Sequence, residues 1–277
     1  MSSPSSTDPD IPGSAAPAPI VARSAVTPDG VDGYLGAPGS DPQLFGGQVA
    51  AQALHAAILT APDGTVAHSL HAHFLVTGDG VEPVRYVVER TRDGRTFATR
   101  RVVATQVAGV VLVLTASFQR PETGVEFQVP PPADAGEPDQ ARRGRYAGDL
   151  VDSRDVPLRR TVGPGHRRLQ WWRVRGAMPD DPVAHQVALA WESDHGPSRA
   201  GRTPHGDHPH IERRRSMSLD HAVWFHRPTK VDEWHVTEIR PLSTSGGRAL
   251  TVGTIHDRAG RHVASLTQEL VLRIPTD

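Results

Sequence analysis

Apolar and polar residues alternate over much of the first half of the chain, after one alanine-rich segment. Residues 48–61 are rich in alanine and contain few helix breakers, which predicts a helix opened by Gly46 and Gly47. A short strand precedes it at residues 30–35, and strand-like segments follow at residues 67–76, 82–91, 97–107 and 110–119. An Asp93-Gly94 pair marks a hairpin turn between two of them. One helix followed by antiparallel strands predicts an α+β unit with the helix on one face of a sheet.

The second half of the chain repeats this order of elements. A strand-like segment at residues 167–176 precedes a helix within residues 180–194. Further strand candidates follow at residues 216–226, 234–242, 248–255 and 263–274. A loop rich in histidine and arginine, residues 195–215, separates the helix from these strands.

Matches between the halves indicate a duplication. Residues 49–56 match residues 183–190 at a constant offset of 134. Ser69-Leu70 matches Ser218-Leu219, and Gly94-Arg95 matches Gly247-Arg248, in the same order along both halves. An ordered series of matches predicts two helix-on-sheet units in tandem.

Composition sets the boundaries between these units. Residues 1–28 are dominated by Ser, Pro and Ala and are expected to form a disordered tail. Residues 29–120 form the first unit and residues 161–277 the second. Residues 121–160 contain three consecutive prolines and a polar run, which is typical of a linker.

The second predicted helix ends in an unusual way. Pro182 suits a first helical turn, because its missing N–H has no helical partner there. The helix then finishes with Glu192, Ser193 and Asp194, although carboxylates are disfavoured at the negative end of the helix dipole. Asp194 either starts the next loop, which is a common use of Asp, or has a function that justifies its position.

Composition excludes several classes of protein. The 277 residues carry a net charge of −1 with a pI near 7.0, which argues against a nucleic-acid-binding protein. The chain has no cysteine, so disulfides, thiolate catalysis and cysteine metal sites are excluded. No apolar run is long enough to span a bilayer and no signal peptide is recognisable, so no membrane association and a cytoplasmic location are expected.

Several motifs resemble those of the acyl-CoA thioesterase II family. They are Phe45-Gly46-Gly47-Gln48-Val49, His68-Ser69-Leu70-His71, Arg92-Asp93-Gly94, Thr115-Ala116-Ser117-Phe118-Gln119, Val263-Ala264-Ser265 with Gln268-Glu269, and, as the most specific, Asp220-His221 with Trp224-Phe225-His226-Arg227-Pro228. The resemblance covers roughly residues 30–274. It implies a double hotdog, in which two helix-wrapped antiparallel sheets are fused in one chain, and it implies hydrolysis of acyl-CoA.

The resemblance also implies three catalytic residues. The family's aspartate falls on Asp194, its hydroxyl residue on Ser218 and its glutamine on Gln268, with Ser in place of Thr at the second position. Their chemistry suits direct attack by water. A carboxylate accepts a proton, an amide offers an acceptor and two donors, and a hydroxyl both donates and accepts. Neither a metal nor an organic cofactor is expected.

Other residues are weaker candidates for binding. Gly46 and Gly47 allow close approach of a substrate to the first helix, although packing explains them equally well. Arg213 and Arg215 are candidates for contact with the phosphates of coenzyme A, although arginines at a loop end are commonly solvated. The cluster of histidines and Asp207 within residues 205–210 resembles a zinc-binding set but lacks regular spacing on a helix, so no metal is predicted.

Two other functions remain open at this stage. A hydratase or dehydratase acting on acyl thioesters needs an Asp/His pair, but Asp220 and His221 are sequence neighbours on a strand and point to opposite faces. They are expected to brace the strand and the interface between the units. A non-catalytic acyl-CoA-binding protein is the second alternative. Exposed sheet edges need to be covered, so a homodimer or higher homo-oligomer is expected.

Overall fold

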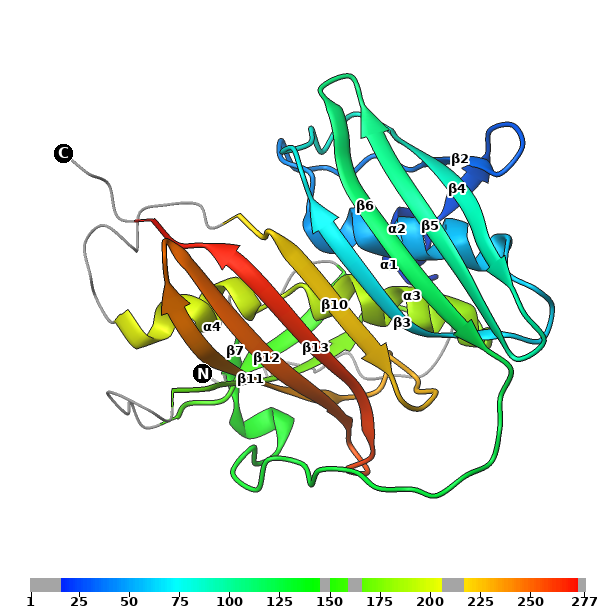
Figure 1. The fold of residues 1–277 in the computed structure, drawn as a ribbon. Coiled ribbons are helices and arrows are strands. Elements are labelled where there is room, and N and C mark those ends of the chain that lie inside the picture. Colours follow the sequence, from blue (N-terminus) through cyan, green and yellow to red (C-terminus); the bar gives the residue numbers. More distant parts are fainter. Residues whose placement is uncertain (1–15, 145–149, 159–165, 206–216, 274–277) are drawn as a thin grey trace, which may run out of the picture.

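The strands that the structure describes all join in one antiparallel sheet. The computed structural model describes residues 16–144, 150–158, 166–205 and 217–273. Over these residues the strand order is β1-β2-β4-β5-β6-β3-β10-β13-β12-β11-β9-β8-β7 (Figure 1). The first half contains α1 (Pro19–Ser24), β1 (Val26–Pro28), β2 (Gly33–Gly36), α2 (Gly46–Leu59), β3 (Val66–Phe74), β4 (Val84–Asp93), β5 (Phe97–Gln106) and β6 (Gly109–Gln119). The second contains η1 (Pro138–Gln140), β7 (Arg142–Arg143), β8 (Val151–Asp155), β9 (Arg168–Val174), α3 (Pro182–Ser193), α4 (Pro197–Arg202), η2 (Thr203–His205), β10 (Asp220–Phe225), β11 (His235–Ser245), β12 (Arg248–Asp257) and β13 (His262–Val271).

The two predicted units are present and meet edge to edge. Strand β3 of the first half pairs with β10 of the second, from His73 opposite Asp220 to Ser69 opposite Trp224. The edge strand of each half is therefore covered by the other half, which removes an exposed edge. The α+β architecture predicted from the sequence is confirmed, with the two sheets continuous across this pair.

Helices α2 and α3 lie side by side on the same face of the sheet (Figure 1). Most of α2 is buried, which its alanine content permits because small side chains allow close packing on every side. The two helices approach each other closely at Gly47. A Cβ atom at this position would lie 2.3 Å from the carbonyl oxygen of Trp191 in α3. The start of α2 is thereby fixed against the end of α3.

Two of the predicted boundaries differ from the structure. Residues 19–28, assigned to the tail, form α1 and β1, because Pro19 starts a helix and Ile20 is fully buried in the core. Residues 142–143 and 151–155, assigned to the linker, form β7 and β8 at the edge of the second half's sheet. The polar composition of β7 and β8 concealed these strands, whereas α1 and β1 are short and depend on contacts with α2, α3 and β2.

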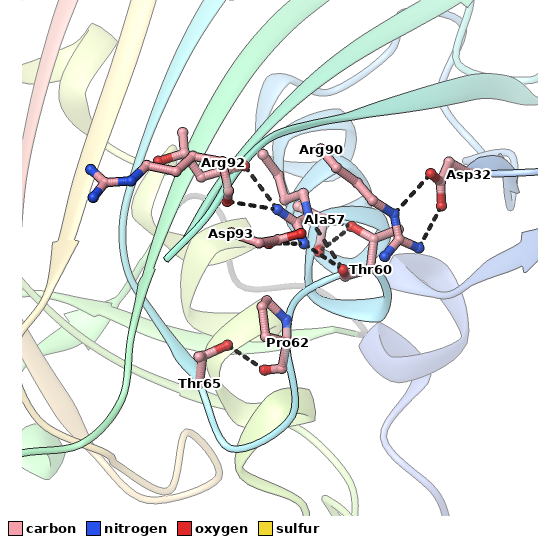
Figure 2. A network of polar contacts seen from close by, with 10 residues as sticks. Asp32, Ala57, Thr60, Pro62, Thr65, Arg90, Arg92 and Asp93 are labelled. Carbon is pink, nitrogen blue, oxygen red and sulfur yellow. Dashed lines mark hydrogen bonds and ion pairs between the residues drawn. The ribbon is translucent and has the colours of Figure 1, made fainter. Parts of the chain in front are cut away.

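The carboxyl end of α2 is closed by a buried arginine. Arg100 of β5 has a side chain with 0% exposure and donates hydrogen bonds to the Thr60 carbonyl at 2.7 Å and the Thr60 hydroxyl at 3.0 Å. Asp93 pairs with the same guanidinium at 2.6 Å. Figure 2 shows this network around Thr60 and Asp93. A cation at the negative end of α2 stabilises the helix dipole. The repeated helix, α3, ends instead in Asp194.

Candidate active site

Asp194 is the C-cap residue of α3, and its carboxylate faces the start of α2. The N-cap of α2 is Phe45, whose side chain makes no capping hydrogen bond. The Gly47 backbone N–H donates a hydrogen bond to Asp194. A Cβ atom at Gly46 would lie 2.7 Å from Asp194 Oδ2, so the carboxylate rests directly against glycine backbone. The carboxylate that is disfavoured by its own helix is thus stabilised by the positive end of the neighbouring one.

The surroundings of Asp194 shift its protonation. Burial raises the pKa of Asp194 to about 6, and Glu192 acts in the same direction. The charge of His195, the Gly47 N–H and the Gln268 amide act to lower this pKa, but they do not compensate fully for burial. A carboxylate with a pKa near 6 is ionised at neutral pH and remains basic enough to accept a proton.

Ser218 and Gln268 lie together next to this carboxylate. Gln268 in β13 is fully buried and donates a hydrogen bond from Nε2 to Ser218 Oγ at 2.5 Å. Ser218 precedes β10 in an isolated bridge with Leu270, and β10 begins at Asp220, four residues later than the predicted start at residue 216. The Gln268 amide also contacts Asp194. The structure therefore brings the three predicted residues into one site.

Two buried acceptors in this site are unpaired. Within the described parts of the chain, neither Asp194 Oδ1 nor Gln268 Oε1 has a hydrogen-bond partner. Buried polar atoms are normally paired with protein or with ordered water. Each of these two acceptors can accept a hydrogen from a water molecule or a ligand.

The site opens into a cleft of about 1000 Å³ between the halves. Apolar side chains, including Phe74 and Trp191, line it together with Asp194 and Ser218. The cleft is also lined by α1, the helix that the sequence placed in the tail, through Pro19 and Arg23. A cleft of this size and mixed lining is typical of a site for a small molecule.

Comparisons with known proteins assign the family. Residues 37–119 match the family model described as acyl-CoA thioesterase N-terminal domain, and residues 143–271 match the model described as acyl-CoA thioesterase. Acyl-CoA thioesterase 2 of Haemophilus influenzae is 32% identical over 83% of this chain and 88% of its own length. The chain belongs to the acyl-CoA thioesterase II family.

Solved structures agree with this assignment. Acyl-CoA thioesterase II TesB2 of Mycobacterium marinum is 38% identical and superposes with a TM-score of 0.82, covering 93% of this chain and 99% of that one. A conserved hot dog protein of Alicyclobacillus acidocaldarius, 20% identical with a TM-score of 0.74, covers 92% of this chain and 98% of its own, and supports the fold alone. The double hotdog fold is confirmed, and the chain is a thioester hydrolase.

The thioesterase site contains residues that the sequence did not single out. His195 stacks on Phe45 at 4.4 Å between ring centroids and contacts Glu192 Oε2 through Nδ1 at 2.7 Å. Burial lowers the pKa of His195, but the charge and hydrogen bond of Glu192 outweigh it and the net pKa is raised. The raised pKa favours the protonated form of His195 beside the Asp194 carboxylate. In the sequence, only the position of His195 directly after Asp194 indicated that it could belong to the site.

Asp220 and His221 have separate roles in the thioesterase. Asp220 Oδ1 accepts a hydrogen bond from the Glu269 N–H at 2.9 Å, which braces the strand as predicted. His221 is fully buried and lies against Ser193 and Gln268 rather than only at the interface. The two side chains do not form an acid/base pair, which leaves the hydratase alternative without structural support.

The remaining predicted residues divide into two groups. Gly46 and Gly47 contact Asp194, so both are part of the site. Arg213, Arg215 and residues 206–210 of the histidine cluster lie outside the described residues. In the parts of the chain that are described, no group of His, Asp or Glu side chains is arranged to hold a metal ion. No described helix is long and apolar enough to cross a membrane.

Proposed function

We propose that the chain hydrolyses acyl-CoA by direct attack of a water molecule held between Asp194 and Gln268. The pair of unpaired acceptors, Asp194 Oδ1 and Gln268 Oε1, carries this proposal. A water that donates to both directs a lone pair away from them, toward a thioester carbonyl in the cleft. Asp194 takes the proton as the new carbon–oxygen bond forms. The carbon–sulfur bond then breaks, and Asp194 returns this proton to the departing sulfur, which gives the acid and the coenzyme A thiol.

Ser218 and the start of α2 support the same step. Ser218 Oγ accepts from Gln268 Nε2, so it holds the amide with Oε1 turned toward the water. The Gly46 N–H belongs to the uncapped first turn of α2 and has no partner within its own helix. A free N–H at a helix start, beside the base, is positioned to stabilise the oxyanion that develops on the carbonyl oxygen.

The cleft also carries positive charge for the nucleotide part of the substrate. Arg23 and Arg202 are half-buried cleft residues, and neither forms an ion pair with the residues that the structure describes. Arg23 Nη1 donates to Ser40 Oγ, and Arg202 Nε donates to the Ser198 carbonyl, which leaves further guanidinium N–H groups for a ligand. Arginine binds phosphate through charged hydrogen bonds, so these two residues are proposed to hold the phosphates of coenzyme A.

Thiol release from a panel of acyl-CoA thioesters tests the catalytic site. Asp194→Asn and Gln268→Ala are expected to lower kcat by at least about 100-fold, because the first removes the base that takes the proton and the second removes an acceptor for the attacking water. Asp63→Asn, in an exposed turn after α2, is the matched control and should retain wild-type activity. Substantial hydrolysis by Asp194→Asn would refute the site. Failure of the wild type to hydrolyse any acyl thioester would refute the function.

Acyl thioesters of N-acetylcysteamine test the binding residues, since they lack phosphate. Arg23→Ala and Arg202→Ala should raise KM for acyl-CoA about tenfold and leave hydrolysis of the short thioester unchanged. Arg85→Ala, which removes an exposed ion pair with Asp29, is the control. An equal loss with both substrates would show that these arginines do not recognise phosphate.

A further inference from the structure

Gln52 in α2 is a fully buried residue whose side-chain amide joins three other segments of the first half. Its Nε2 atom donates to the Arg23 carbonyl at 2.7 Å and to the Ala37 carbonyl at 2.8 Å. Its Oε1 atom accepts from the Tyr86 hydroxyl of β4 at 2.7 Å. Carbonyl oxygens carry no hydrogen, so only one orientation of the amide satisfies all three contacts. Both amide hydrogens are therefore committed to holding backbone carbonyls in place.

The backbone at the end of β2 leaves room for this amide. A Cβ atom at Gly36 would lie 2.3 Å from Gln52 Oε1, which is closer than Cβ atoms come to their neighbours in proteins. Gln48, one turn earlier on the same side of α2, is also buried and donates to the same Ala37 carbonyl at 2.9 Å. Two amides on successive turns of α2 thus hold the start of the loop 37–40.

The two segments bound by Gln52 both carry residues of the cleft. Arg23 in α1 and Ser40 line it, and Arg23 Nη1 donates to Ser40 Oγ at 2.9 Å. Ser40 follows Ala37 in the same loop. Gln52 therefore binds the backbone of the arginine on one side, and on the other side the loop that supplies a partner for the guanidinium.

The corresponding glutamine of the second half makes a different connection. Gln186 of α3 matches Gln52 at the offset of 134 residues, and its Nε2 atom donates to the Ala67 carbonyl in β3 at 2.7 Å. Neither Gln186 nor Ala67 belongs to the described lining of the cleft. The same residue type joins α3 to the sheet, whereas it joins α2 to segments that line the cleft.

We propose that Gln52 is a positioning residue that fixes Arg23 for the phosphates of coenzyme A, by binding its carbonyl and the loop that presents Ser40. The proposal rests on the phosphate-binding role proposed for Arg23 and assigns Gln52 no contact with the substrate. Helix α1 has only six residues, too few to be stable by itself, so its arginine needs support from other elements. An arginine held in place before the substrate binds loses less conformational freedom on binding, so loss of the support should raise KM.

Kinetics with two substrates test the role of Gln52. Gln52→Met keeps the length of the side chain and removes both donors. The variant should raise KM for acyl-CoA about three- to tenfold with kcat within about twofold of wild type, and should leave KM for the N-acetylcysteamine thioester, which lacks phosphate, unchanged. Gln186→Met is the matched control and should leave KM for both substrates unchanged. Ser40→Ala, at an exposed position where folding is not at risk, should raise KM for acyl-CoA alone, by about threefold.

A double-mutant cycle with Arg23→Ala provides a further measurement. Without the guanidinium there is nothing to position, so adding Gln52→Met to Arg23→Ala should change KM for acyl-CoA less than about twofold. Additive increases in the cycle, an equal rise of KM with both substrates, or an unchanged KM in Gln52→Met or in Ser40→Ala would overturn the proposal. Arg23→Ala alone tests phosphate binding and wild-type hydrolysis tests the function, so the failure of each is distinguished. Thermal unfolding identifies any variant that does not fold, and Ser40→Ala then decides.

Discussion

Replacement of Gly46 by alanine is expected to lower activity without lowering stability. Gly46 is the first residue of α2, and its backbone lies directly against the Asp194 carboxylate. In most helices a Gly→Ala change is stabilising, by about 0.5–1 kcal/mol, because alanine loses less conformational entropy on folding. Here the added methyl group meets the proposed catalytic base. The effect on stability and the effect on activity therefore have opposite signs, and each is measured separately.

The geometry gives the size of the effect. The new Cβ would lie 2.7 Å from Asp194 Oδ2 and 3.1 Å from Phe74 Cζ, whereas ordinary contacts of Cβ atoms lie at 3.4–4 Å. The carboxylate must therefore shift by roughly 0.5–1 Å, and a misplacement of about 1 Å costs on the order of 100-fold in rate. We expect kcat to fall about 10- to 100-fold, which corresponds to about 1.4–2.7 kcal/mol in the activation barrier.

Steady-state hydrolysis of one acyl-CoA and thermal unfolding test this prediction together. Gly124→Ala is the matched control, because a Cβ there meets nothing within 4 Å. The expected result for Gly46→Ala is a reduced kcat, a KM close to wild type and an unchanged or slightly raised Tm. A kcat within twofold of wild type would refute the reasoning that the start of α2 positions the carboxylate. A reduced kcat accompanied by a large fall in Tm would attribute the loss to packing against Phe74.

Two further predictions concern the ends of the central helices. Because burial raises the pKa of Asp194 to about 6, the stability present while Asp194 is protonated is lost as the pH rises from about 4 to about 6. Asp194→Asn should thus raise the free energy of unfolding by about 2–3 kcal/mol at pH 8 and by much less at pH 4, as measured by urea unfolding. In the wild type, kcat/KM should rise with pH up to about 6 and then level off, because the ionised carboxylate is the proposed base. Arg100→Met should cost about 3 kcal/mol, because it leaves the buried Thr60 carbonyl and the end of α2 without their cation. The kcat of Arg100→Met, measured well below the Tm of the variant, should stay near wild type, because the end of α2 lies apart from the proposed site. A loss of kcat without a loss of stability would contradict this prediction.

The two central helices differ at their ends, although they occupy corresponding places in the duplication. The C-cap of α2 is Thr60, closed by Arg100, and the C-cap of α3 at the corresponding position is Asp194. The two helices also differ in how their starts are capped. Asp181 caps α3 with its own side chain, which accepts from the Val183 N–H, while α2 begins without a side-chain cap. The uncapped start and the charged end meet at one place, and the site lies there.

Local sequence predicted the regular elements well where the pattern was strong. The alanine-rich helix, the Asp93-Gly94 turn and the long strands of both halves are where periodicity placed them, because each buries one face against the core. The short elements α1, α4, β7 and β8 were missed. Each has few residues, and β7 and β8 are also polar, so the stability of these elements comes from contacts with distant segments rather than from their own pattern.

The sequence by itself determined the duplication, the fold class and the identity of the three residues proposed to act on the water. Only the tertiary structure decided how Asp194 is tolerated and what surrounds it. The dipole that stabilises its carboxylate belongs to α2, more than 130 residues earlier in the chain, and the donor is a backbone N–H that no side-chain pattern reveals. The same holds for His221, whose contact with Ser193 joins β10 to the end of α3 and is not indicated by the pattern of either element. Periodicity records which face of an element is buried, whereas hydrogen-bond direction and helix dipoles act between elements and become visible only when these are assembled.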